Sequence, residues 1–169
     1  TMALSYATHD WVLSIDADEE VSTELRNEIT AMLSETEQAA AYTVPRKTIH
    51  FNRWIKHGGW YPNRLVRLFR KSHGKWQGNA VHEYWSTTGT VAALDSDLIH
   101  YSFTGLSDQV ERNNKYSSLG AENLKTKETK FGILKLLFKP VSKFLETYLL
   151  KLGFLDGYPG FIISVSAAY

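Results

Sequence analysis

The sequence predicts an α/β protein with a mixed sheet and with amphipathic helices toward its C-terminal end. An apolar run at residues 11–15 is followed at once by acidic residues and then by a helical pattern. From residue 46 to residue 100 the polar and apolar residues mostly alternate, which is typical of strands. Between residues 131 and 152, lysines and large apolar residues fall on opposite sides of a helix.

The first region predicts a strand, an acidic turn and a helix. Residues 11–15 are apolar apart from one serine, as expected of a buried strand. Acidic side chains then occupy four of the five positions from 16 to 20. Ser22 can cap a helix whose apolar residues recur at helical spacing to about position 33.

The middle of the chain predicts several further strands. Residues 40–44 favour a strand that ends at Pro45. Ser107 is expected to cap a polar helix that reaches about residue 125. The remaining strand candidates, separated by glycines, lie at residues 65–69, 81–85, 90–94 and 98–103.

The tail predicts two amphipathic helices, because Pro140 belongs in the first turn of a second helix. Its apolar side suits a helix that lies in a membrane surface, and the same side could equally pack on the protein's own core. The charged side carries Lys135, Lys139, Lys143 and Glu146, with Lys151 at its edge.

The overall composition excludes several classes of function. The chain has 169 residues, with 19 Lys and Arg against 18 Asp and Glu, so its formal net charge is +1. This balance disfavours a general nucleic-acid-binding protein, which needs a basic surface. The absence of cysteine excludes thiolate metal sites and cysteine nucleophiles. Because no run approaches the roughly 20 apolar residues of a membrane span and no signal peptide is evident, we expect a cytoplasmic protein.

The most specific chemical signal is the pair Asp16 and Asp18, directly after the first predicted strand. Ligands of open α/β sheets bind outside the carboxyl ends of the strands. Two carboxylates at that place can approach one hard cation such as Mg²⁺ or Mn²⁺, and that cation can neutralise a diphosphate. The alternative is that both residues only stabilise the dipole of the helix that follows.

Two further groups could complete such a site. Glu83 lies in a predicted strand and is a candidate general base, although taken alone an exposed strand glutamate is the simpler explanation. His100 ends an apolar stretch and could add a nitrogen ligand to a carboxylate metal site, although a core histidine is the simpler explanation.

A fourth signal is the segment of residues 57–64, which contains paired glycines, two aromatic residues and an arginine. Trp60 and Tyr61 offer flat apolar faces of the kind on which sugar rings stack. Arg64 and Arg67 could bind phosphate through their planar guanidinium groups. A loop with solvated arginines is the alternative.

Together these segments resemble the inverting family 2 glycosyltransferases of the GT-A fold. Residues 10–19 look like the metal-binding segment of that family. Residues 54–64, Arg67-Leu68-Phe69-Arg70 and Val81-His82-Glu83 are similar to the bacterial branch that contains the lipopolysaccharide-core β-1,4-glucosyltransferases. The resemblance covers nearly the whole chain and implies a GT-A-like, Rossmann-related mixed sheet.

The resemblance also implies partners and roles. It implies a nucleotide-diphosphate sugar donor such as a UDP-hexose, a saccharide or lipid-linked acceptor, and a divalent metal, Mg²⁺ or Mn²⁺. Asp18 matches the metal-ligand position, with Asp16 beside it near the sugar and the diphosphate. Glu83 matches the catalytic base. Because His82 stands where many members carry a second acidic residue, both Glu83 and His82 stay candidates for the base.

The family's N-terminal strands, which hold the nucleotide base and ribose, do not occur before Thr1. The chain also stops inside an apolar run at residues 161–169. We therefore expect an incomplete GT-A sheet from a longer enzyme. Residues 1–127 would form the metal- and acceptor-binding portion of the catalytic domain, and residues 128–169 would form an amphipathic tail at the inner face of the cytoplasmic membrane.

These residues suit a single displacement. Glu83 would deprotonate an acceptor hydroxyl, which would attack the anomeric carbon from the face opposite the leaving diphosphate and so invert it. Two rival functions remain. One is an aspartate-nucleophile phosphatase, although Glu20 stands where such enzymes usually carry threonine or valine. The other is a membrane-surface or partner-binding module without catalysis.

Overall fold

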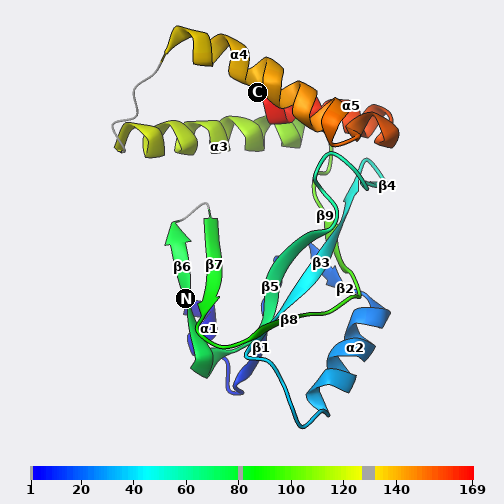
Figure 1. The fold of residues 1–169 in the computed structure, drawn as a ribbon, viewed down its shortest axis with the longest axis vertical. Coiled ribbons are helices and arrows are strands. Elements are labelled where there is room, and N and C mark those ends of the chain that lie inside the picture. The colour runs from blue at the N-terminus through cyan, green and yellow to red at the C-terminus, as the bar shows by residue number, and fades with distance from the viewer. Residues whose placement is uncertain (1, 80–81, 127–131) are drawn as a thin grey trace. The chain divides into compact units, whose positions relative to one another are not determined.

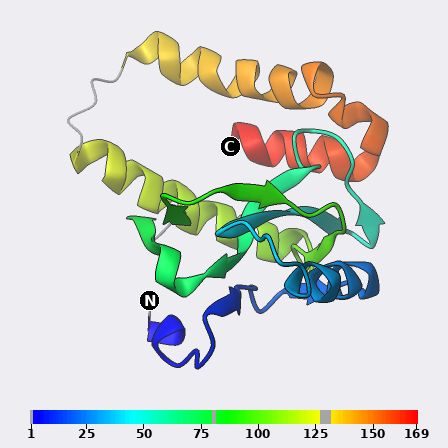
Figure 2. The ribbon, with the colours of Figure 1, turned by 60° about the horizontal axis from the view of Figure 1, so that its bottom comes forward.

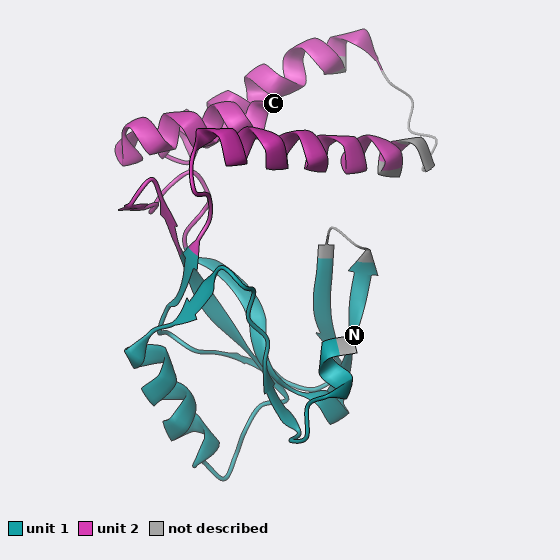
Figure 3. Cartoon of the chain, turned by 180° about the vertical axis from the view of Figure 1, so that it is seen from behind, with its two compact units in different colours: residues 1–47, 62–100 teal, residues 48–61, 101–169 magenta. Residues whose placement is uncertain are grey.

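A computed structural model describes residues 2–79, 82–126 and 132–169. The chain divides into two compact units, which Figure 3 colours separately. Unit 1 comprises residues 1–47 and 62–100, and unit 2 comprises residues 48–61 and 101–169. The predicted boundary between a catalytic portion (residues 1–127) and a tail (residues 128–169) falls at residues outside those described, and it stays a prediction.

Unit 1 centres on a mixed sheet (Figures 1 and 2). Its elements, of which β3 and β9 run past its limits, are α1 (Met2–Ser5), β1 (Trp11–Leu13), β2 (Glu19–Val21), α2 (Thr23–Leu33), β3 (Ala41–His50), β5 (Asn63–Arg70), the 3₁₀ turn η1 (Lys71–His73), β6 (Gly74–Asn79), β7 (His82–Thr87), β8 (Val91–Ala93) and β9 (Leu98–Tyr101). The strand order is β1-β5-β3-β9-β2. β5 is antiparallel to both β1 and β3, β2 is antiparallel to β9, and β8 adds to β3 in parallel.

The two faces of this sheet are covered by different elements. Helix α2 buries Leu25 and Met32 against the first face, and Ser22 caps it as predicted by accepting from the backbone N–H of Leu25. The opposite face packs on the β6–β7 hairpin, where the rings of Phe69 and Trp85 stack with their centroids 3.9 Å apart. These two small cores fix the sheet that carries the acidic turn.

Unit 2 is mainly helical. Its elements are β4 (Arg53–Trp54), α3 (Leu106–Thr126), α4 (Ile133–Leu145), the π-helical segment η2 (Glu146–Leu150), the 3₁₀ turn η3 (Gly153–Asp156) and α5 (Tyr158–Ala168). β4 pairs with Ile49 and His50 at the end of β3. The buried Gln109 of α3 bonds to His50 and also donates to Ser166 of α5, so a polar chain joins three elements.

Most predicted elements are confirmed, including α2, β3, β5 and α3, and the fold class is mixed α/β. The first predicted strand is shorter and less buried than expected. β1 stops at Leu13 and Ile15 is exposed; within the described residues β1 pairs with β5 alone, so its other edge stays uncovered there. Ser107 does not cap α3: it lies in its first turn, and Asp108 accepts from the backbone N–H of Thr104 instead.

Pro45 and Pro140 do not interrupt their elements, contrary to the prediction. β3 continues past Pro45 to His50. β8 pairs only with residues 41–43 of β3, so the N–H that Pro45 lacks is not needed for a hydrogen bond to β8. α4 likewise runs through Pro140. The missing N–H would have bonded to the carbonyl of Leu136, and Leu136 is exposed, so water can take its place. Within the described residues, no helix is long and apolar enough to cross a membrane.

Candidate functional site

The acidic residues after β1 form a tight turn. The backbone N–H of Glu19 donates to the carbonyl of Asp16 at 3.0 Å, and the backbone N–H of Asp16 donates back to Glu19 Oε2 at 2.9 Å. Ala17 and Asp18 therefore occupy the two corners of the turn. Aspartate suits such turns because its short side chain can accept bonds from nearby backbone N–H groups. The carboxylate of Asp18 is thus presented at the corner, with 36% of its side chain exposed.

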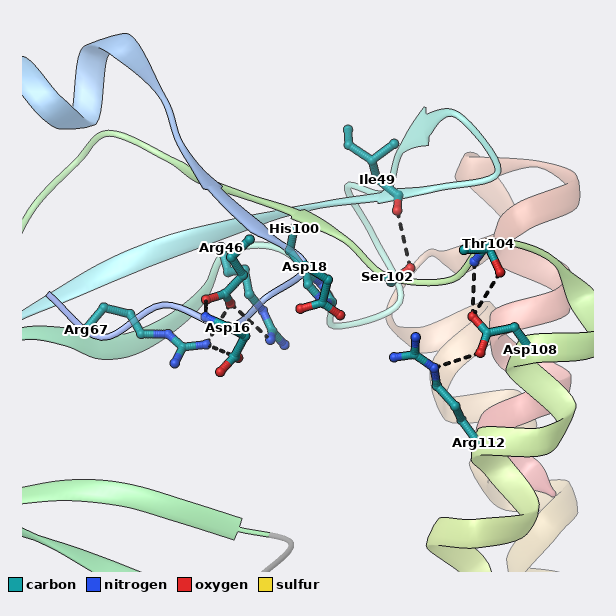
Figure 4. Close-up of polar contacts among 11 residues, drawn as sticks. Asp16, Asp18, Arg46, Ile49, Arg67, His100, Ser102, Thr104, Asp108 and Arg112 are labelled. Carbon is teal, nitrogen blue, oxygen red and sulfur yellow. Dashed lines mark hydrogen bonds and ion pairs between the residues drawn. The ribbon is translucent and has the colours of Figure 1, made fainter. Parts of the chain in front are cut away.

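Glu19 is the buried anchor of this turn. Its side chain is fully buried, and Oε1 accepts a bond of 2.6 Å from Nη2 of Arg67. The same Nη2 lies 2.5 Å from Oδ2 of Asp16, as Figure 4 shows. A buried carboxylate is tolerated only when it is paired and hydrogen-bonded, so Arg67 holds both acidic side chains in place.

A bulge in β5 directs Arg67 toward the turn. Tyr42 of β3 pairs with Leu68 and the next residue, Thr43, pairs with Val66, so Arg67 has no partner in the ladder. A bulge changes the direction of the extra residue's side chain and is frequent next to functional sites. The backbone carbonyl of Arg67 also accepts from Ser14, at the end of β1. The irregular pairing therefore connects the turn to the sheet at both backbone and side chain.

His100 reaches the turn through β9. The pairing of β2 with β9 puts His100 opposite Glu19, and Nε2 of His100 lies 3.6 Å from Oδ2 of Asp18. Burial lowers the pKa of His100, and the positive charge of Arg46 lowers it further, although the nearby carboxylates act in the other direction. A neutral imidazole is the form that can act as a metal ligand.

These groups fit an open metal site rather than a closed one. Among the residues that the structure describes, no three His, Asp or Glu side chains are placed to hold a metal ion together. Asp18 and His100 offer two groups of the kinds that ligate metals, while Asp16 is turned toward Arg67. Mg²⁺ is commonly held by one or two carboxylates together with water and substrate phosphates, which suits this set.

Arg46 also belongs to this region, and the sequence analysis missed it. Its Nη1 lies 3.7 Å from Oε1 of Glu19, and its side chain is 23% exposed. Nothing in the sequence pattern marked it, because it is one basic residue after Pro45 in a strand. Figure 4 shows Arg46, Asp16, Asp18 and His100 gathered around the turn.

The candidate bases lie on the β6–β7 hairpin. Glu83 is exposed and pairs with Gly78 across the hairpin. The backbone of His82 belongs to β7, but its side chain lies outside what the structure describes, as does Val81 of the same motif. The assignment of the base to Glu83 or His82 therefore stays a prediction.

The segment of residues 57–64 is divided between the two units. Trp60 and Tyr61 belong to unit 2, and Arg64 and Arg67 belong to unit 1. Nη1 of Arg64 donates to the carbonyl of Leu94 at 2.7 Å. Arg64 and Arg67 therefore both donate to acceptors within the protein, whereas phosphate was the predicted acceptor. Sugar and phosphate binding by these four residues stays a prediction.

The loop before Trp60 is held inside unit 2 by Asp156. The buried Asp156 carboxylate accepts from the backbone N–H of Lys56 and of His57, and from Nδ1 of His57 at 2.9 Å. Gly58 and Gly59 have φ values of 67° and 81°, which glycine adopts easily. The backbone N–H of Gly58 donates to the carbonyl of Lys151. The paired glycines thus allow close contact with the chain's own η2 region, where a ligand had been expected.

The chain is similar to named glycosyltransferases along its whole length. It is 28% identical over 184 residues to an uncharacterized glycosyltransferase of Rickettsia typhi, covering 100% of this chain and 62% of that protein. It is 29% identical to an uncharacterized glycosyltransferase of Rickettsia felis, covering 100% of the chain and 64% of the relative. It is 27% identical over 168 residues to the lipopolysaccharide core biosynthesis glycosyltransferase LpsC of Rhizobium meliloti, covering 98% of the chain and 62% of LpsC.

The chain thus spans less than two thirds of the length of these relatives. No protein-family model matches the chain. No solved structure matches it either.

Proposed function

We propose that this chain carries the metal- and acceptor-binding part of an inverting glycosyltransferase of family 2 with a GT-A fold. It would move a sugar, such as the hexose of a UDP-hexose, to a saccharide or glycolipid acceptor of the lipopolysaccharide core or another cell-envelope glycan. The acidic turn carries the proposal: Asp18 stands at its corner beside His100, and Glu19 and Arg67 fix its shape. The glycosyltransferase relatives support the same reaction class.

In this proposal Asp18 and His100 would hold the divalent cation, which when bound would stabilise the negative charge on the leaving diphosphate. Asp16 keeps its bond to Arg67 and faces the donor sugar. Arg67 is a positioning residue, since its guanidinium joins Asp16 to the buried Glu19. The turn is therefore formed by the chain's own contacts, and binding of the donor would require little rearrangement of it.

A base on the β6–β7 hairpin completes the proposed chemistry. Glu83 or His82 would accept the proton of the acceptor hydroxyl as its oxygen attacks the anomeric carbon. The bond to the diphosphate breaks on the opposite face, which inverts the configuration in a single displacement. No covalent intermediate on the protein is needed, in agreement with a chain that lacks cysteine.

The central test is Asp18→Asn in the full-length protein. Sugar transfer from a panel of nucleotide sugars should be lost, because the amide keeps the shape of the side chain but removes its charge. Asp95→Asn is the matched control, since the side chain of Asp95 is 92% exposed and remote in sequence from the turn. Near-wild-type turnover of Asp18→Asn across a range of Mn²⁺ concentrations would contradict the metal role.

The base is tested separately with Glu83→Gln and His82→Gln. Loss of a general base lowers turnover by about 10²–10⁴-fold while donor binding remains. Whichever variant shows that drop in kcat with an unchanged KM for the donor identifies the base. A change confined to KM in both variants would assign these residues to binding and leave the proton acceptor elsewhere.

We further propose that α4 docks on an anionic membrane surface, where a lipid-linked acceptor would be found. Ile133, Leu134, Leu136, Leu137, Phe138 and Val141 of α4 are each more than half exposed. Patches of this kind on a soluble protein mark interaction sites. Lys139 and Lys143 on the charged side are complementary to anionic headgroups, which favours a lipid surface over an apolar protein partner.

Co-sedimentation with vesicles tests this docking. Phosphatidylglycerol-rich vesicles should bind the full-length protein, and Leu134→Ser with Leu137→Ser should abolish binding by removing apolar contact area. Leu33→Ser with Val91→Ser is the control, because these apolar residues are partly exposed but lie in unit 1. Equal binding of both double variants, or equal binding to neutral and anionic vesicles, would contradict the proposal.

A further inference from the structure

Arg46 is a second guanidinium beside a carboxylate that already has its hydrogen bonds. Oε1 of Glu19 accepts from Arg67 at 2.6 Å, and Oε2 accepts from the backbone N–H of Asp16 at 2.9 Å. Nη1 of Arg46 lies 3.7 Å from Oε1, which is beyond the range of a hydrogen bond. The contact between Arg46 and Glu19 is therefore an ion pair only, and Glu19 is satisfied without it.

The N–H donors of Arg46 have no acceptor within the described part of the chain. Its Nε is buried and unpaired, and no hydrogen bond forms from either Nη. Nε of Arg67 is also unpaired, but Nη2 of Arg67 makes two short bonds. A guanidinium carries five donors in a planar fork, and donors inside a protein are normally satisfied. This fork thus has the capacity to bind an acceptor that the chain itself does not supply.

The position of Arg46 indicates what that acceptor is. Its positive charge acts on His100, whose Nε2 lies beside the carboxylate of Asp18. The geometry agrees: Nη1 of Arg46 lies 3.7 Å from Oε1 of Glu19, and Glu19 stands opposite His100 in the pairing of β2 with β9. Figure 4 shows Arg46 gathered with Asp18 and His100, the two groups proposed to hold a divalent cation. An oxyanion that bridges the cation and the fork has the chemistry of a phosphate, whose oxygens match a guanidinium in bidentate geometry.

We propose that Arg46 binds a phosphate oxygen of the donor's diphosphate through its guanidinium fork. This inference rests on the proposed function and adds a residue to it. Asp16, Asp18 and Glu19 outnumber the guanidinium groups of Arg46 and Arg67, so the region alone repels anions. The diphosphate therefore binds together with the divalent cation, and Arg46 supplies the directional contact. Arg46 thus contributes to donor affinity while Arg67 positions the turn.

The test measures the affinity of the full-length protein for inorganic pyrophosphate by calorimetry, with and without Mn²⁺. Wild-type protein should bind pyrophosphate only with Mn²⁺. Arg46→Lys keeps the charge beside Glu19 but loses the fork, so its dissociation constant should rise at least about tenfold. Arg46→Gln should show a larger rise. Arg26→Gln, at an exposed position on α2, is the matched control and should bind as the wild type does.

Thermal unfolding separates binding from folding, since Arg46→Lys should melt close to the wild type. A dissociation constant for Arg46→Lys within twofold of the wild type would overturn the assignment of Arg46, and so would absence of pyrophosphate binding by the wild type. Failure of the proposed function looks different: pyrophosphate binds and Arg46→Lys weakens it, but no nucleotide sugar donates its sugar. In that case the phosphate site stands and the glycosyl transfer does not.

Discussion

Glu19 in unit 1 and Asp156 in unit 2 are both buried carboxylates, but they are stabilised in different ways. The side chain of Glu19 is fully buried and lies against the guanidinium groups of Arg67 and Arg46. The side chain of Asp156 is 6% exposed and accepts from two backbone N–H groups and from the imidazole of His57. One carboxylate is compensated by full positive charges, and the other mainly by backbone dipoles.

The difference separates the proposed chemical site from a structural one. The charge of Glu19 is compensated by two arginines, while the carboxylates of Asp16 and Asp18 lie beside it at the surface. Surface carboxylates of this kind are the oxygen ligands that a divalent metal cation prefers. Compensation at Asp156 uses N–H groups of a loop nearly 100 residues earlier in the chain and joins that loop to η3. We infer that Asp156 chiefly fixes the backbone, whereas Glu19 orders a turn that presents the carboxylate of Asp18 at its corner.

The largest expected effect comes from removing the Arg67 guanidinium that pairs with Glu19. Arg67→Met should lower the free energy of unfolding by about 3–5 kcal/mol, because it leaves a buried carboxylate without its charged partner. Urea denaturation measures the change. Arg26→Met, an exposed arginine of the same unit, should change it little. Equal stability of the two variants would mean that Arg46 alone can compensate Glu19, and the contrast between the two carboxylates would weaken.

A smaller effect is expected at the second carboxylate. Asp156→Asn keeps the size of the side chain but replaces one acceptor oxygen by an NH₂ group, which must face an N–H donor. Leaving buried donors unsatisfied costs about 1–3 kcal/mol of unfolding free energy. Asp97→Asn, a substitution of the same kind outside the buried loop contact, is the control for urea denaturation. A loss as large as that of Arg67→Met would show that the contacts of Asp156 matter as much to folding as the arginine contacts of Glu19.

Sequence reasoning found the parts of this contrast that are local. The turn at Asp16 and Asp18 and the cap at Ser22 follow from residue types at short spacing. The strand pairing that brings His100 beside the turn requires contacts about 80 residues apart, which no local pattern specifies. The bulge that directs Arg67 is likewise a property of two paired strands. His100 was a candidate because histidine can complete a carboxylate metal site, but no local pattern placed it beside the turn.

Asp156 and the two prolines Pro45 and Pro140 also show that a residue's role can depend on contacts that the sequence does not specify. In the sequence Asp156 is one acidic residue between Gly153 and Gly157, and its role depends on a loop far away in the sequence. Pro45 and Pro140 were predicted to interrupt their elements, and both lie inside them. A proline excludes one hydrogen bond, and whether that bond is needed depends on the neighbouring strand or on solvent. Neighbours of this kind become known only from the fold.

A pH-dependent effect is expected from a buried histidine of unit 2. Burial lowers the pKa of His50 below its ordinary value near 6.5, although its bond to Gln109 opposes this. Below about pH 6.5 the unfolded chain takes up a proton that the folded chain does not, so the free energy of unfolding falls as the pH is lowered. His50→Gln should make this fall less steep in urea denaturation at several pH values. An identical slope in variant and wild type would remove His50 as its source.

The smallest expected effect concerns Glu146, a partly exposed carboxylate that has more ammonium partners than Asp156. Its oxygens lie 2.6 Å from Nζ of Lys151 and 3.1 Å from Nζ of Lys143, and these hydrogen bonds lower its pKa. Water and salt screen exposed ion pairs, so Glu146→Gln should leave the midpoint of unfolding at its wild-type value. The same substitution releases two lysines near α4, and so it should strengthen binding to anionic vesicles at low salt. A marked loss of stability would mean that the number of ion pairs, and not burial, sets the importance of a carboxylate in this protein, and the contrast between Glu19 and Asp156 would then need another explanation.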